Sequence, residues 1–176
     1  DHANVVDFHR ILEADGYIAF VMEYIDGVTL ESWLEKYRGR IDQSIIAALF
    51  ADILRGVRHA HENGVLHRDL KPSNIMITQE ETDGRASAKI IDFGVARGAD
   101  EAPSRLDREK IRGTAAYMSP EEIASPDNVS EASDLYSIGV MLYEAAAGAR
   151  PFESEYCHHR RNLERRCWLL LAFRNG

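Results

Sequence analysis

Cysteine is almost missing from this 176-residue sequence, and its two copies, Cys157 and Cys167, both lie among the last twenty residues. A disulfide framework is therefore excluded for the main body. Long apolar runs are also absent, since no stretch approaches the roughly 18 apolar residues of a membrane span. The N-terminus, which begins with Asp1 and His2, has neither the positive flank nor the apolar core of a signal peptide. These absences indicate a cytosolic segment without membrane contact of its own, and they leave open a membrane tether elsewhere in a parent protein.

Basic residues are the other shortage. The sequence has 21 Lys and Arg against 29 Asp and Glu, which gives a net charge of −8. Such a chain lacks the basic footprint that binding to a phosphate backbone needs, so no nucleic acid is expected as a partner. Apolar residues make up 45 % and charged residues 28 %, as in ordinary globular proteins, and the length leaves room for one domain.

Two β-rich runs open the chain, Val5 to Leu12 and Tyr17 to Tyr24. The Asp15-Gly16 pair between them supplies the positive φ angles of a tight turn, so we predict a hairpin. Thr29 can then cap a short helix, because the apolar residues after it recur at spacings of three and four. These residues are Leu30, Trp33, Leu34 and Tyr37.

Helical periodicity also predicts the longest helix, from about Gln43 to Glu62, which ends at Asn63 and Gly64 because glycine relieves a left-handed cap. A helix of this length buries one stripe of side chains and exposes the other. Its apolar stripe comprises Ile45, Ile46, Leu49, Ile53, Val57 and Ala60.

Shorter elements follow. Residues 74–77 and 88–91 are β-rich pieces separated by a polar stretch, which predicts two strands and a surface loop. Ser119 and Pro120 fit the N-cap and first position of a helix. A last buried helix is predicted over 133–147, where Gly148 stops it.

The most informative segment is residues 67–74, which read His-Arg-Asp-Leu-Lys-Pro-Ser-Asn, followed eighteen residues later by Asp92-Phe93-Gly94. They match the patterns H-R-D-L-x-x-x-N and D-F-G in order. A single Asp is more often a turn residue or a surface carboxylate. Seven fixed letters, at about one in twenty each, reduce chance agreement to roughly one in 10⁹ per start position.

This combination suits phosphoryl transfer, which needs a carboxylate near the attacking hydroxyl and oxygen ligands for Mg²⁺. Asp69 suits the first role, while the Asn74 amide oxygen and the Asp92 carboxylate suit the second. On these motifs the chain resembles the Ser/Thr protein kinase family, in its bacterial eukaryotic-like branch. The resemblance implies an α+β, protein-kinase-like fold with a mostly helical large lobe and a small lobe reduced to a hairpin and hinge.

The resemblance also implies ATP and Mg²⁺ as cofactors and protein Ser or Thr hydroxyls as acceptors. It makes Asp69, Lys71, Asn74 and Thr114 the catalytic set, with Lys71 beside the γ-phosphate and Thr114 orienting Asp69. In the family the residue matching Asp134 holds the backbone of the catalytic loop. The residues matching His67 and Phe93 pack in an internal spine.

For the nucleotide, the resemblance assigns the segment from Tyr17 to Asp26 to the strand and hinge behind adenine. Met22 would be the gatekeeper, and the backbone of Glu23 and Ile25 would be the hydrogen-bonding edge. Met76 would lie under the purine, and Asp92 would hold Mg²⁺ together with Asn74. Taken alone, these residues would fit an ordinary core strand.

The resemblance covers residues 1–153, and residues 154–176 form a divergent tail of charge +3. The segment from His2 to Val6 resembles H-P-N-I-V, which lies partway into a kinase domain. No G-x-G-x-x-G and no lysine in a V-A-I-K context occur in the sequence. We therefore expect a chain incomplete for catalysis, and a non-catalytic fragment or docking module with weak nucleotide binding is the alternative.

The tail has its own open questions. Its Cys157-His158-His159 run and Cys167 match no standard zinc spacing. The change of charge and composition at residue 154 suggests foreign or out-of-frame sequence, a hypothesis that an intact gene would exclude. An unpaired sheet edge and missing helices predict exposed apolar surface, and therefore poor solubility or oligomerisation.

Overall fold

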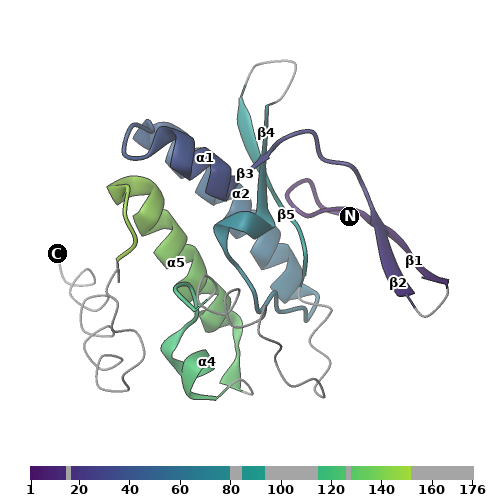
Figure 1. The fold of residues 1–176 in the computed structure, drawn as a ribbon. Coiled ribbons are helices and arrows are strands. Elements are labelled where there is room, and N and C mark those ends of the chain that lie inside the picture. The colour runs from purple at the N-terminus through teal and green to yellow at the C-terminus, as the bar shows by residue number, and fades with distance from the viewer. Residues whose placement is uncertain (15–16, 80–84, 94–114, 126–127, 152–176) are drawn as a thin grey trace.

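The computed structural model describes residues 1–14, 17–79, 85–93, 115–125 and 128–151 (Figure 1). Its elements in chain order are β1 Phe8–Ala14, β2 Tyr17–Met22, β3 Val28–Thr29, α1 Leu30–Tyr37, α2 Gln43–Glu62, the 3₁₀ turn η1 Pro72–Asn74, β4 Ile75–Gln79, β5 Ala86–Ile90, α4 Pro120–Ala124 and α5 Glu131–Ala147. Thr114 and the tail at 154–176 lie outside the described residues.

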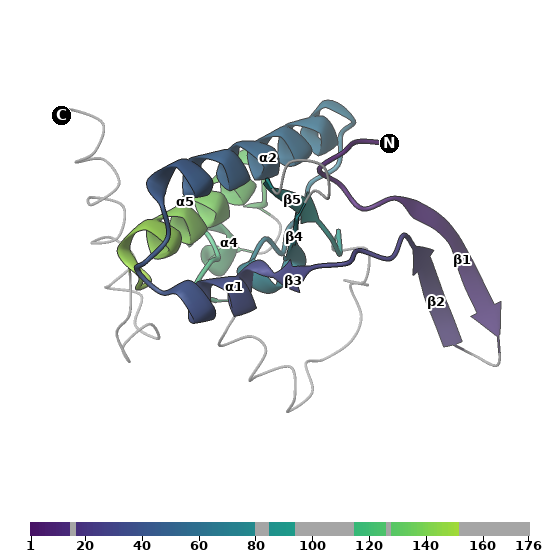
Figure 2. The ribbon, with the colours of Figure 1, turned by 90° about the horizontal axis from the view of Figure 1, so that it is seen from above.

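A three-stranded antiparallel sheet, ordered β3-β4-β5, lies at the centre, and α2 packs against both β5 and α5 (Figures 1 and 2). Strands β1 and β2 form a separate two-stranded sheet that projects from this body (Figure 2). The predicted α+β architecture, with a small lobe reduced to a hairpin and hinge, is confirmed. None of the helices in the described ranges is both long and apolar enough to serve as a membrane span.

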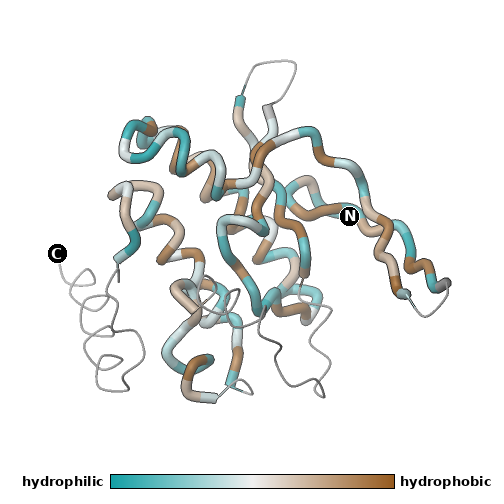
Figure 3. Tube along the Cα trace, viewed as in Figure 1, coloured by the Kyte–Doolittle hydropathy of each residue, from teal (hydrophilic) through white to brown (hydrophobic). Residues whose placement is uncertain are grey.

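The core lies between the sheet and the helices α1, α2 and α5, where Figure 3 shows apolar segments facing one another. Its most deeply buried large side chains are Leu30, Leu49, Ile53, Ile75, Ile90 and Met141. Ile45, which the sequence analysis placed in the apolar stripe of α2, is 41 % exposed. One residue along a helix is a rotation of about 100°, so Ile45 faces solvent when its neighbour Ile46 faces the core.

The helix boundaries follow the predicted caps. The Thr29 hydroxyl accepts from the Ser32 amide at the start of α1, and Ser119 does the same for Glu122 in α4. Gly148 adopts a left-handed φ of 73° after α5. The start of α5 was predicted two residues late, because Ser133 belongs to the first turn and its hydroxyl accepts from the Ser130 amide.

The predicted hairpin is confirmed, but its first strand starts at Phe8 instead of Val5. The preceding residues pair with β5: the Val6 amide donates to Ile90 at 2.9 Å and the Ile90 amide donates to Asn4 at 3.0 Å. The hairpin itself leaves apolar side chains in solvent, with Ile11 56 % and Ile18 63 % exposed. The sequence pattern found the strands but not the pairing partner of residues 4–6.

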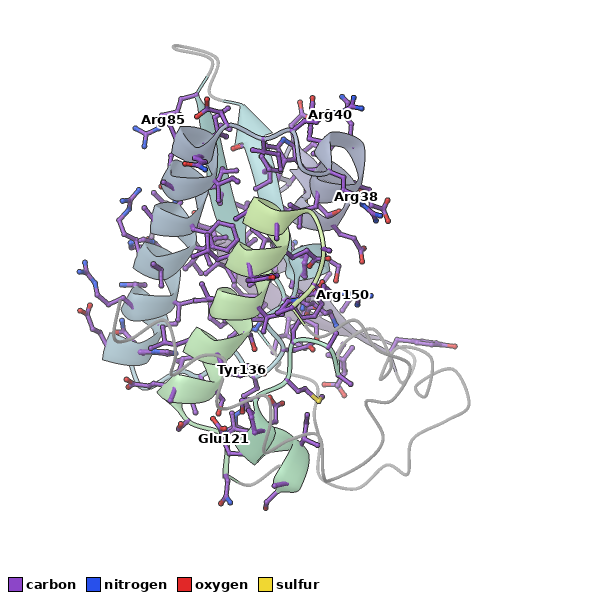
Figure 4. All side chains as sticks on the ribbon, turned by 90° about the vertical axis from the view of Figure 1, so that its left-hand side faces the viewer. Arg38, Arg40, Arg85, Glu121, Tyr136 and Arg150 are labelled. Atoms are coloured by element: carbon purple, nitrogen blue, oxygen red, sulfur yellow. The ribbon has the colours of Figure 1, made fainter. Side chains whose placement is uncertain are left out.

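Side-chain contacts fix the segment around α4 to α5. At one end of α5 the Ser133 hydroxyl donates to Glu121, which is labelled in Figure 4. Toward the other end, near Arg150, the Tyr117 hydroxyl donates to Glu144 at 2.6 Å. Burial and this bond raise the pKa of Tyr117 far above its ordinary value, so the phenol stays a proton donor.

Gly27, just before β3, is a position where only glycine fits. A Cβ there would collide with the main-chain carbonyl of Ile77 on β4 and would lie 3.2 Å from Cγ2 of Thr78. Backbone cannot give way as a flexible side chain can. The close approach of the segment to β4 therefore depends on the missing side chain.

We predict that Gly27→Ala lowers the free energy of unfolding by about 1–3 kcal/mol, the usual cost of overpacking. The control is Gly139→Ala on α5, where a Cβ meets no atom of the described residues within 4 Å. Alanine is the better helix former, so this variant should be unchanged or more stable by up to about 1 kcal/mol. Urea unfolding followed by circular dichroism measures both. Equal stability of the two variants would contradict the packing argument.

Candidate active site

A single buried carboxylate holds the loop that carries the H-R-D pattern. Asp134 on α5 is 2 % exposed, and its oxygens accept from the His67 amide at 2.9 Å and the Arg68 amide at 3.0 Å. Its Oδ2 also lies 2.8 Å from Nε2 of His61 on α2. The role expected for Asp134 from the resemblance is therefore seen directly in these bonds.

Arg68 needs this support because its backbone has a φ of 65°, which is unusual for a residue other than glycine. Such conformations cost about 1–3 kcal/mol and persist where the surroundings enforce them. The two bonds to Asp134, one from Arg68 itself and one from the residue before it, enforce it here. This bend immediately precedes Asp69, the third residue of the H-R-D pattern.

His67 links this loop to the segment after β5. Its ring is 1 % exposed, lies 4.7 Å from the Phe93 ring, and has Nε2 3.1 Å from the Ile91 carbonyl oxygen. The Asp69 amide donates to Nδ1 at 3.3 Å. One nitrogen accepts and the other must donate, which requires a neutral imidazole protonated on Nε2. Burial lowers the pKa of His67, which favours that neutral form. The packing role was predicted, but these polar contacts were not.

Asp69, Lys71 and Asn74 come together around one carboxylate. The Lys71 ammonium lies 2.7 Å from Oδ2 of Asp69, and the Asn74 amide nitrogen lies 3.3 Å from the same oxygen. That nitrogen also donates to the Asp69 carbonyl at 2.9 Å. The nitrogen end of the Asn74 amide is thus occupied by Asp69. In the described part of the chain, Oδ1 of Asp69 is buried without a hydrogen-bond partner.

Asp92 lies between two residues that contact the loop of residues 67–74. The Ile91 amide donates to the Asn74 carbonyl at 2.9 Å, and Phe93 packs on His67. Asp92 itself is exposed and has a φ of 60°, a second backbone outlier in the same region. Clustered outliers of this kind are typical of functional sites, because the surroundings must hold them.

The residues predicted around adenine lie on two structural units. Met22 ends β2 and is 40 % exposed, and Ile25 is half-buried in the segment before β3. Met76 is half-buried on β4, where its register partner on β5 is Lys89. The Lys89 ammonium reaches Glu23 at 2.5 Å and so connects the two units. Sequence reasoning missed this pair, since nothing local links two charges 66 residues apart.

The structure brings some of the predicted site residues into contact with one another. Asp69, Lys71 and Asn74 contact one another, and Asp92 lies next in chain to a residue bonded to Asn74. Thr114 is outside the described residues.

Comparison with known proteins places this sequence in a family. The family model described as "Protein kinase domain" matches residues 1–173. Serine/threonine-protein kinase PknB of Mycobacterium tuberculosis is 40 % identical over 136 residues, 77 % of this chain and 21 % of the relative. Its namesake in Mycobacterium leprae is 39 % identical over 86 % of this chain and 24 % of the relative.

Serine/threonine-protein kinase PrkC of Bacillus subtilis is 32 % identical over 88 % of this chain and 23 % of the relative. The chain therefore spans about a quarter or less of the length of these curated relatives. The matched part carries both motifs and the bonds that bring them together. The chain belongs to the protein kinase family, among bacterial relatives of the eukaryotic-like serine/threonine type.

Proposed function

We propose that this chain carries the acceptor and metal half of a Ser/Thr kinase site, which transfers the γ-phosphoryl group of ATP to a protein hydroxyl. The observation that supports this most is the state of Asp69. One of its oxygens is held by Lys71 and Asn74, while the other is buried and has no partner in the described part of the chain. A buried carboxylate oxygen left free is costly unless something binds it.

Asp69 would accept a hydrogen bond from the substrate hydroxyl through its free oxygen. As the new oxygen–phosphorus bond forms and the bond to the bridging oxygen of ADP breaks, the hydroxyl proton passes to the carboxylate. Lys71, held against Asp69, places a positive charge beside the developing negative charge. Thr114 completes this acceptor set in the proposal, as the resemblance implies.

Asn74 and Asp92 fit a hard cation, because both offer oxygen ligands and the Asn74 amide is already oriented by its bond to Asp69. They are the residues that would hold Mg²⁺. When bound, Mg²⁺ neutralises charge on the phosphates. The Ile91 to Asn74 backbone bond, which fixes the residue before Asp92 to Asn74, supports this assignment.

The adenine site is proposed at the hinge. The Glu23 amide is already bonded to the Asp7 carbonyl, so the main-chain groups that face a nucleotide would be the Glu23 carbonyl and the Ile25 amide. Met22 and Met76 would supply the apolar walls. Both are partly exposed and so accessible to a ligand.

A second function has one observation in its favour. The 176 residues contain no G-x-G-x-x-G and no lysine in a V-A-I-K context, which contact the phosphates in the family. A non-catalytic module with weak nucleotide binding needs neither. The assay of phosphate transfer below separates the two functions.

We predict that Mg²⁺ strengthens binding of a fluorescent ATP analogue to the wild-type chain and that Asp92→Asn removes this increment. A charge-assisted interaction contributes about 1.5–3 kcal/mol, which corresponds to about ten- to a hundredfold in affinity. Asp69→Asn should keep the increment, because Asp69 faces the acceptor. EDTA should reduce wild-type binding to the Asp92→Asn level. A metal effect that persists in Asp92→Asn would exclude this residue as a ligand.

We predict that Asp69→Asn lowers transfer of radioactive γ-phosphate to a Ser/Thr peptide by about 10²–10⁴-fold, as for loss of a general base. Lys71→Met should lower kcat by about 10²-fold or more with little change in KM for ATP. The substitutions are made in a chain extended upstream by the glycine-rich loop and strand lysine, and the unsubstituted 176-residue chain is assayed beside it. Transfer by the extended chain alone supports the kinase site and the incompleteness of the 176 residues. Absence of transfer in both chains favours the non-catalytic module.

A further inference from the structure

One carboxylate at the hinge joins three segments of the chain. The Glu23 side chain accepts from the Asp7 amide at 2.9 Å and from the Lys89 ammonium at 2.5 Å through the same oxygen, Oε1. The Glu23 amide returns a bond to the Asp7 carbonyl at 2.9 Å. The residue that follows β2 is therefore fixed both to the start of β1 and to β5.

The surroundings make this more than a surface ion pair. The side chains of Glu23 and Lys89 are only 25 % and 24 % exposed. Burial raises the pKa of the Glu23 carboxyl, yet the hydrogen bonds from Lys89 and the Asp7 amide, together with the Lys89 charge, bring that pKa below its ordinary value. Glu23 is therefore ionised at neutral pH, and the pair with Lys89 is a charged one.

The Glu23–Lys89 pair lies between the two sheets of the protein. Within the described ranges no strand of the β1-β2 sheet pairs with the β3-β4-β5 sheet, and on the β1 side the chain is attached to β5 through the bonds of residues 4–6 to Ile90. The pair crosses between these sheets, because Glu23 ends the hairpin and Lys89 lies on β5 opposite Met76. Three residues beyond Lys89 the chain reaches Asp92. One ion pair thus connects the edge proposed for adenine with the strand that leads to the proposed metal ligand.

We infer that Glu23 and Lys89 form a positioning pair, which sets the distance between the adenine-binding backbone and the Met76 and Asp92 side of the nucleotide site. This inference rests on the proposed nucleotide site. Neither side chain touches the nucleotide in the proposal, since Glu23 acts through its own backbone and Lys89 through Glu23. Loss of the pair leaves each half of the site intact and leaves the bonds of residues 4–6 to Ile90 as the remaining attachment, so the distance between the two halves becomes less well fixed.

The test substitutes Lys89 and leaves the Glu23 to Asp7 bonds in place. Lys89→Met removes the ammonium but keeps a long apolar side chain, and Lys89→Arg restores the charge. The control is Lys36→Met on α1, which removes the same charge from a side chain that lies over Tyr37 at 5.0 Å. Two properties of the 176-residue chain are measured: binding of mant-ATP with Mg²⁺, and hydrogen exchange of the Asp7 and Glu23 amides without nucleotide.

We expect Lys89→Met to weaken mant-ATP binding about tenfold, as for loss of one charge-assisted hydrogen bond, and to speed exchange of both amides. Lys89→Arg should stay within about threefold of wild type in both measurements, and Lys36→Met should match wild type. Rescue by arginine separates positioning by the charge from a general packing role of the lysine stem. Should Lys89→Met fail to fold, Glu23→Gln, which keeps an acceptor for the Asp7 amide, should show the same two changes to a smaller degree.

Two results would overturn the inference: unchanged affinity with unchanged amide exchange in Lys89→Met, or equal losses in Lys89→Met and Lys36→Met. Failure of the proposed function looks different. In that case wild type binds no mant-ATP, while exchange of the two amides in the nucleotide-free chain still reports on the pair. In that case, faster exchange in Lys89→Met than in wild type still shows that the Glu23–Lys89 pair fixes the hinge to β5. Exchange at the wild-type rate would show that it does not.

Discussion

The carboxylate of Asp134 is the contact on which the rest of the site depends. Three groups converge on it, the amides of His67 and Arg68 and the ring of His61. Hydrogen bonds to a buried charged group contribute about 1.5–3 kcal/mol each, which is enough to offset a backbone in the left-handed region at Arg68. Without that bend, the segment from Asp69 to Asn74 would not be held in the position where Asn74 accepts a bond from the Ile91 amide after β5.

Two further hydrogen bonds connect the loop held by Asp134 with the segment after β5. His67 reaches the Ile91 carbonyl, and the Ile91 amide reaches the Asn74 carbonyl. Both motifs are therefore fixed by their neighbours, while the polar tips of Asp69 and Asp92 stay available for chemistry. A kinase needs this division, because catalysis of phosphoryl transfer is mainly positioning and charge neutralisation.

Sequence reasoning predicted those parts of the fold whose cause is local. The limits of α2, the Thr29 cap and the left-handed Gly148 follow from periodicity and cap chemistry within a few residues. The contacts among Asp69, Lys71 and Asn74 agree with the motif spacing, because these residues are close in the chain as well as in space. The pairing of residues 4–6 with Ile90 and the bond from Glu23 to Lys89 could not be predicted, since each joins segments more than sixty residues apart without a spacing rule.

The projecting β1-β2 hairpin has a thermodynamic consequence. A two-stranded hairpin is at best marginally stable in water, and this one leaves Ile11 and Ile18 largely in solvent. Any ligand that prefers the ordered hinge stabilises the folded hairpin by a free energy that, above the dissociation constant, grows with the logarithm of ligand concentration. Binding of the ligand and folding of the hairpin are therefore thermodynamically linked. Without such a ligand, we expect the bare strand edges of the hairpin to favour association between chains.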